Sequence, residues 1–159
     1  MNKRALVGKI IAQIDGELEG FAKSARAAHA EATDEQSKAE NKYDTRGLEA
    51  SYLARGQSRQ AAETAQARQE FEELSLRDFE PGDLIDLSAL VELETAGERT
   101  LYFIGPRAGG AEIRHEKKTV LVITPQSPLG RQLIGRKAGE HLQIAMGGVC
   151  LDYTVVSVA

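Results

Sequence analysis

The stretch that decides how this chain folds is residues 6–32, LVGKIIAQIDGELEGFAKSARAAHAEA. Apolar or small side chains recur in it every seven residues, at Val7, Ile14, Phe21 and Ala28. A second series fills the alternate position of the repeat, at Ile10 or Ile11, Leu18, Ala25 and Ala32. A seven-residue repeat sustained over about four repeats is typical of a helix packed along a partner helix. We therefore expect a helix about 40 Å long over residues 6–32, at about 1.5 Å per residue.

A second helix is predicted from about residue 37 to residue 76. Its apolar stripe is looser and consists of Tyr43, Ala50, Leu53, Ala61, Thr64, Phe71 and Leu74. The only short polar break between the two helices is residues 30–37. Two long helices joined by a few residues fold back on one another, so we expect an antiparallel hairpin with a narrow tip.

The composition changes near residue 80. Residues 1–80 contain no proline, whereas all four prolines and most β-branched runs lie beyond. Strands are predicted at residues 84–87, 89–93, 100–104, 119–123, 142–146 and 149–158, the last two joined at Gly147-Gly148. A short helix runs from Pro128 to Gly135 with Ser127 as its N-cap. The expected fold is α+β: an antiparallel two-helix coiled coil at residues 1–78, then a small antiparallel β-sheet domain with one short helix at residues 79–159.

Composition also limits the function classes. The chain has 159 residues and 20 basic against 24 acidic side chains, which argues against a protein that coats duplex DNA. The single cysteine, Cys150, excludes an intrachain disulfide and a cysteine-built zinc site, and we expect it to pack as a small apolar side chain. The three histidines are scattered, at residues 29, 115 and 141. No signal peptide or membrane span is predicted, so a cytoplasmic protein without a membrane partner is expected. We also expect a monomer.

Three stretches of the second half resemble the C-terminal domain of the bacterial Gre transcript-cleavage factors, GreA and GreB. They are Tyr102-Phe103-Ile104-Gly105-Pro106, residues 123–140, and the closing Gly147-Gly148 with Tyr153-Thr154-Val155-Val156. Within the second stretch, residues 127–139 are similar to the family signature S-P-L-x-R-x-L-x-G-K-x-x-G, with Arg136 where lysine is usual.

This resemblance implies a sheet domain of the FK506-binding-protein type that docks on RNA polymerase near its secondary channel, through Ser127, Pro128 and Leu129. It also implies that the helical finger enters the channel. Acidic residues at the tip would then help to hold the second Mg²⁺ of the polymerase and orient a water that cleaves the backtracked transcript. The chain would be an accessory factor and not an enzyme, with no stably bound metal or cofactor of its own and only indirect contact with the RNA 3′ end.

The tip resembles the family pattern D-x-x-E-N-A-E-Y only in part. In one alignment Asp34 falls on the aspartate and Ser37 replaces the first glutamate. In the other, Glu40-Asn41 falls on the E-N step and Ser37 takes the aspartate position. The candidate tip carboxylates are therefore Asp34, Glu35 and Glu40. Because one carboxylate is missing in either alignment, the alternative is a homologue that occupies the channel and regulates or inhibits transcription without stimulating cleavage.

The charged residues around the tip also have structural interpretations. Asp34 and Glu35 fit a capping box that begins at Thr33 and ends at Gln36. Lys38, Lys42 and Arg46 recur every four residues. They form either a solvated helix face or a basic stripe that contacts RNA phosphates or the channel.

Two other function classes stay open. The FK506-binding-like domain could be a peptidyl-prolyl isomerase, but the only rings for its pocket are Phe79, Tyr102, Phe103 and Tyr153. The finger could instead be a coiled-coil adaptor that pairs with another helix, which predicts a partly exposed seam and self-association.

Overall fold

The computed structural model describes residues 1–33, 45–146 and 148–159, with the backbone only at residues 32–33, 45–52 and 146. The chain divides into two compact units. We call them the sheet unit, Met1–Ile10 with Glu70–Ala159, and the finger unit, Ile11–Gln69. The first residues of the predicted hairpin and its last residues thus group with the sheet unit.

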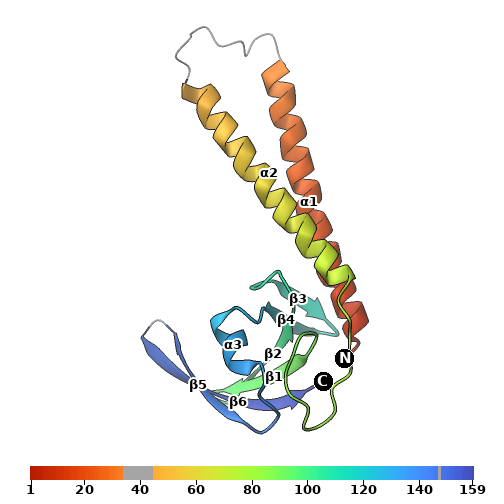
Figure 1. The fold of residues 1–159 in the computed structure, drawn as a ribbon, viewed down its shortest axis with the longest axis vertical. Helices are drawn as coiled ribbons and strands as arrows, with labels where there is room; N and C mark the ends of the chain where they lie inside the picture. The colour runs from red at the N-terminus through yellow and green to blue at the C-terminus, as the bar shows by residue number, and fades with distance from the viewer. Residues whose placement is uncertain (34–44, 147) are drawn as a thin grey trace. The chain divides into compact units, whose positions relative to one another are not determined.

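The finger unit is built from two helices, α1 (Lys3–Thr33) and α2 (Thr45–Glu72), which run in opposite directions (Figure 1). Residues 18–29 of α1 line the same groove as residues 54–61 of α2, and Asp15 forms an ion pair with Arg68 at 2.5 Å. Residue numbers therefore rise along one helix as they fall along the other. The two predicted helices are confirmed, although α2 ends at Glu72 and not at residue 76.

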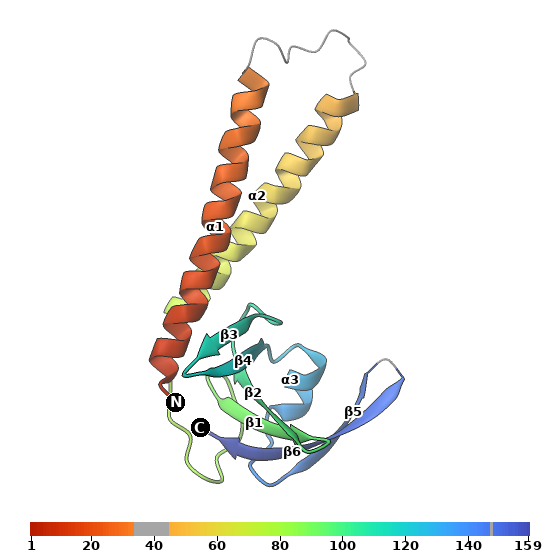
Figure 2. The same ribbon diagram turned by 180° about the vertical axis from the view of Figure 1, so that it is seen from behind.

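The heptad seam of α1 is packed in its first half only. Ile14 is buried, Leu18 and Phe21 are half-buried, and Ala25 and Ala28 are exposed. Figures 1 and 2 both show α1 and α2 separating toward residues 33 and 45. Alanine side chains are too short to fill the space between two helices at that separation, so the repeat continues in the sequence without close packing.

The sheet unit contains six strands and one short helix: β1 (Leu90–Thr95), β2 (Glu98–Ile104), β3 (Glu112–His115), β4 (Lys118–Ile123), α3 (Pro128–Leu133), β5 (His141–Met146) and β6 (Val149–Val158). The strand order is β3-β4-β2-β1-β6-β5. Strands β2 and β4 pair in parallel, and the other neighbours are antiparallel.

The prediction of a wholly antiparallel sheet is therefore wrong. Strand β3, which the sequence analysis did not identify, forms a hairpin with β4 and so turns β4 parallel to β2. It has only four residues, and both Glu112 and Arg114 are exposed. So short and charged a segment does not show the apolar alternation by which a strand is recognised.

The predicted strand at residues 84–87 is also wrong, because this segment is a loop. Ile85 is buried in the core, whereas Leu84 and Leu87 are exposed. The backbone of Ile85 bonds to the turn after α3: its N–H donates to Arg136 O at 2.7 Å, and its carbonyl accepts from Gly135 N at 2.9 Å. Within residues 84–87, Ile85 thus provides the side chain that packs in the core.

Both faces of the sheet are covered within the sheet unit. One face forms a core with α3 and the 79–89 loop, made of Phe79, Ile85, Ala89, Val91, Leu93, Ile104, Ile123, Leu133, Leu142, Ile144, Tyr153 and Val155. Side chains alternate along a strand, so Phe103, Val120 and Val122 point to the opposite face. Phe71, in the last turn of α2, packs there: a methyl group added to Gly105 would meet its ring at 2.9 Å and Val122 at 3.1 Å.

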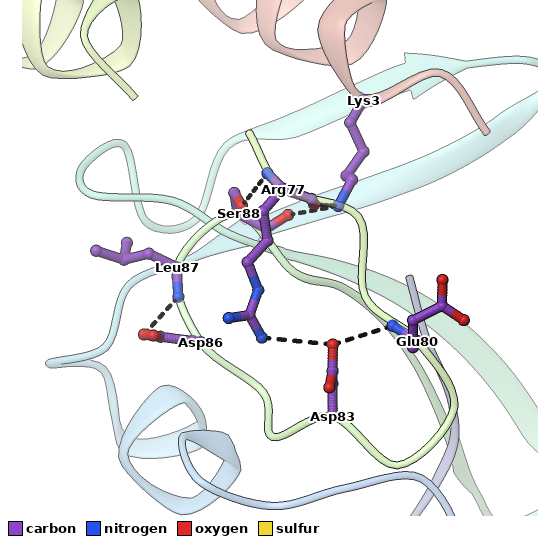
Figure 3. Close-up of polar contacts among 7 residues, drawn as sticks. All are labelled: Lys3, Arg77, Glu80, Asp83, Asp86, Leu87 and Ser88. Carbon is purple, nitrogen blue, oxygen red and sulfur yellow. Dashed lines mark hydrogen bonds and ion pairs between the residues drawn. The ribbon is translucent and has the colours of Figure 1, made fainter. Parts of the chain in front are cut away.

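The first turn of α1 is tied to the segment that follows α2 (Figure 3). The Lys3 ammonium donates to the carbonyls of Arg77 and Ser88 and lies 4.8 Å from the centre of the Phe79 ring. Burial lowers the pKa of Lys3, and the charge of Asp78 opposes this shift. The carboxylate of Asp83 then holds the same loop by pairing with Arg77 at 3.7 Å and accepting from the Glu80 N–H at 3.0 Å.

Candidate functional site

The turn that opens α3 is the best-defined part of the predicted docking surface. Ser127 has an extended backbone, and its hydroxyl accepts from the N–H of Gly130 at 3.0 Å and donates to Thr124 O at 2.8 Å. Pro128 occupies the first turn of the helix, where a missing N–H costs nothing. The predicted N-cap and helix start are confirmed.

Gly130 is the residue on which this turn depends. A Cβ at this position would lie 1.9 Å from Thr124 O and 2.9 Å from the Ser127 hydroxyl. No side chain fits there unless the cap opens. The sequence indicates the roles of the serine and the proline but not the requirement for glycine, which arises from a contact across the turn.

The corner at α3 exposes one of the three predicted docking residues and leaves the other two half-buried. The side chain of Ser127 is occupied by capping, and Leu129 packs against the core. Pro128 is exposed, as are Arg131 and Ile134 nearby. Among the three predicted docking residues, Pro128 therefore has the most exposed side chain.

The aromatic side chains of this half fill the core. Phe103 is fully buried, Phe79 and Tyr153 are 8% exposed and belong to the α3-side core, and Tyr102 packs against it. Burial raises the pKa of Tyr102, and the nearby Tyr153 adds to this shift. Rings used in this way do not wall an open prolyl pocket, so the structure gives the isomerase hypothesis no support.

The predicted tip residues lie outside the described part of the chain. This holds for the carboxylates of Asp34, Glu35 and Glu40 and for Lys38 and Lys42. Arg46 is in α2, where only the backbone is described. The capping box from Thr33 to Gln36 also lies outside the described side chains, so this interpretation stays a prediction. The metal-assisting role of the tip stays a prediction.

The described side chains of the finger unit separate charge along its length. We call residues 11–20 with 63–69 the inner half, and residues 21–31 with 53–62 the outer half. The inner half carries four acidic and one basic side chain, net −3, and the outer half carries four basic and one acidic, net +3. The sequence predicts the antiparallel hairpin but not its register, and the charge pattern emerges only once the residues that lie opposite each other, such as Asp15 and Arg68, are known.

His115, Glu116 and Cys150 also carry reactive or titratable side chains. His115 is 5% exposed and lies 3.3 Å from Glu116, whose carboxylate also accepts from the Asn2 N–H at 3.2 Å. That hydrogen bond lowers the pKa of Glu116.

Cys150 is exposed, so the expectation that it packs as a small apolar side chain is wrong. Among the residues described, no three His, Cys, Asp or Glu side chains gather in a way that could hold a metal ion.

No helix in the described ranges has the length and apolar character needed to cross a membrane.

Comparisons with known proteins give only distant likenesses. No family model matches the chain, and no curated protein matches its sequence. Among solved structures, Gfh1 of Thermus aquaticus is 21% identical over 96% of this chain and 90% of its own, with a TM-score of 0.40. GreA factor homolog 1 (Gfh1) of Thermus thermophilus is 19% identical over 94% of each chain, with a TM-score of 0.39. The prokaryotic transcription elongation factor GreA/GreB from Nitrosomonas europaea is 17% identical over 60% of this chain and 78% of its own, with a TM-score of 0.38. Likenesses at this level establish neither family nor function.

Proposed function

We propose that this chain is a Gre-type accessory factor that binds RNA polymerase at its secondary channel and acts on backtracked transcripts. The observation that carries the proposal is the co-occurrence, in one chain, of the signature-like run of residues 127–139 and an antiparallel pair of long helices. In this run Ser127 caps α3 and Gly130 meets Thr124 too closely for a side chain. Gly135 and Gly139 have φ values of 80° and 88°, which favour glycine. An FK506-binding-protein-like arrangement of the sheet unit is part of the same proposal.

The sheet unit supplies the docking surface in this proposal. Pro128 is exposed at the start of α3, and Arg131 adds a positive charge on the same short helix. The cap bonds of Ser127 hold this turn in one conformation, so docking there would cost little ordering entropy. Pro128 and Arg131 are the side chains that we assign to contact with the polymerase.

The finger unit supplies the inserted element. Its outer half is net positive over the described side chains, which suits a path lined by RNA phosphates and acidic groups. Lys38, Lys42 and Arg46 would extend this basic surface toward the tip. Asp34, supported by Glu35 or Glu40, would add a carboxylate to the Mg²⁺ site of the polymerase, because Mg²⁺ prefers carboxylate and water oxygens.

A second candidate function has one specific observation in its favour. Ser37 stands where one of the two tip carboxylates is expected, in either alignment of the tip. A factor with a single carboxylate could occupy the channel and regulate or inhibit transcription without stimulating cleavage.

A backtracked elongation complex with a labelled transcript separates these functions. We expect the wild-type chain to shorten the transcript and Asp34→Ala to lose at least about tenfold in cleavage rate while binding equally well. Glu31→Ala, which removes an exposed α1 carboxylate near the end of the described helix, is the matched control and should cleave normally. Binding without shortening would establish the second function, and absence of polymerase binding would overturn both.

A further inference from the structure

The finger unit contains an open apolar groove that its own side chains do not fill. The groove measures about 560 Å³ and lies between α1 and α2. Its apolar walls are Leu18, Phe21, Ala22, Ala25 and Ala28 from α1 and Ala54 and Ala61 from α2. Three of the ten side chains that line it are polar, His29, Gln57 and Ser58.

Water is a poor occupant of such a groove. The groove is open to solvent, and the water in it lies against mainly apolar side chains that offer it few hydrogen bonds. Leu18 and Phe21 are only half-buried in the seam. Covering them would bury apolar surface at about 25 cal/mol per Å². Covering the groove with a helical partner would therefore be favourable in free energy.

The charges of the finger unit indicate what kind of helical partner would fit the groove. The inner half is net −3 and the outer half net +3 over the described side chains. The groups responsible include Glu19, which is 65% exposed, and Arg59, which is 83% exposed. A second finger laid antiparallel on the first would bring each acidic inner half against a basic outer half. A parallel arrangement would bring like charges together.

We propose that two copies of this chain associate through their finger units, with the open seams facing each other and the fingers antiparallel. The contact is isologous: the same residues act on both copies, and the charge match is made twice. Four helices then enclose one apolar core, an arrangement that fills seams of this kind in helix bundles. The dimer goes beyond the proposed function and needs no polymerase to form. It covers the outer half that the proposed function places in the channel, so a chain in the dimer would have to dissociate before its finger could insert.

Sedimentation of the full chain over a range of concentrations tests the proposal directly. We expect a reversible dimer whose dissociation constant rises about tenfold or more between low and high salt, because exposed charges are screened. A chain that sediments as a monomer at every concentration and salt would overturn the proposal.

Substitution in the seam shows whether the groove is the contact. Ala25→Glu places a charge in the groove at an already exposed helix position, and it should abolish the dimer. Ala27→Glu is the matched control, because two residues along a helix turn the side chain about 200° away. Far-UV circular dichroism should show equal helix content in both. Equal dimerisation by the two variants would overturn the proposal.

Charge reversal tests the antiparallel arrangement. Arg55→Glu with Arg59→Glu makes the outer half net negative, and Glu17→Lys with Glu19→Lys makes the inner half net positive. Each double variant alone opposes like charges in an antiparallel pair and should be monomeric. All four substitutions in one chain make the inner half net positive and the outer half net negative, so an antiparallel pair again brings opposite charges together while a parallel pair still brings like charges together. This quadruple variant should dimerise again. A quadruple variant that stays monomeric, or double variants that dimerise alone as well as the wild type does, would overturn the arrangement.

Discussion

The sheet unit and the finger unit of this chain are stabilised in different ways. The sheet unit buries large side chains on both faces of its sheet, including Phe71, Phe103 and Ile104. In the finger unit, the buried side chains within residues 11–31 and 53–69 are Ile14 and Ala67. The sheet unit is thus held by packing, whereas the finger unit depends on helix propensity and on exposed ion pairs such as Lys23 with Glu19 and Arg59 with Glu63.

Helix α2 is packed within the sheet unit near its end and exposed to solvent near its start. Phe71, near its end, is 1% exposed, whereas Leu53, near its start, is 66% exposed. A helix that is polar nearly all round does not gain its stability from a core. Substitutions of the same kind should therefore have different effects at its two ends.

The largest expected effect is that of Phe71→Ala. Removing a fully buried phenylalanine leaves a cavity beside Gly105 and Val122, which should cost the sheet unit about 4 kcal/mol in free energy of unfolding. Leu53→Ala, the control on the same helix, should cost less than about 0.5 kcal/mol. Denaturant unfolding, with hydrogen exchange resolved for each unit, measures both. Equal losses would mean that the finger unit has a core which its exposed side chains do not indicate.

A second prediction concerns a glycine in the sheet unit whose surroundings leave no space for a side chain. Gly130→Ala forces a methyl group against Thr124 O and should destabilise the sheet unit by about 2 kcal/mol, with hydrogen exchange fastest in α3. Gly8→Ala in the same unit is the control, since nothing lies within 4 Å of a Cβ there. It should be neutral or slightly stabilising. Tolerance of alanine at residue 130 would show that the cap of Ser127 opens easily.

The sequence predicted most reliably the structural features that depend on residues close to one another in the chain. The heptad repeat predicted the first helix and a looser apolar stripe the second. Ser127 with Pro128 predicted the start of α3, because propensity and capping act over a few residues. Features that depend on distant residues were missed. Ile85 was taken as part of a strand because its bonds to residues 135 and 136 leave no mark in its local sequence.

Strand pairing and charge distribution show the same limit. The parallel pairing of β2 with β4 depends on β3, whose four residues carry too little apolar signal. The two oppositely charged halves of the finger unit become visible only once residues 15 and 68 are known to lie opposite each other. Of the candidate site, the sequence indicated the exposed Pro128 and the cap. The tip carboxylates Asp34, Glu35 and Glu40 stay predictions.

The smallest expected effect has the opposite sign and lies in the finger unit. Gly16 and Gly20 are exposed in α1, and a Cβ at either position would meet nothing within 4 Å. Glycine inside a helix costs about 1 kcal/mol relative to alanine. Because no core dominates the stability here, Gly16→Ala and Gly20→Ala should each stabilise the finger unit by about that amount and slow hydrogen exchange of residues 11–31 about fivefold. Exchange in β1 and β6 should not change. If exchange slowed equally in both units, the chain would unfold as one cooperative body, and the contrast between a packed sheet unit and a finger unit held by its helices would be wrong.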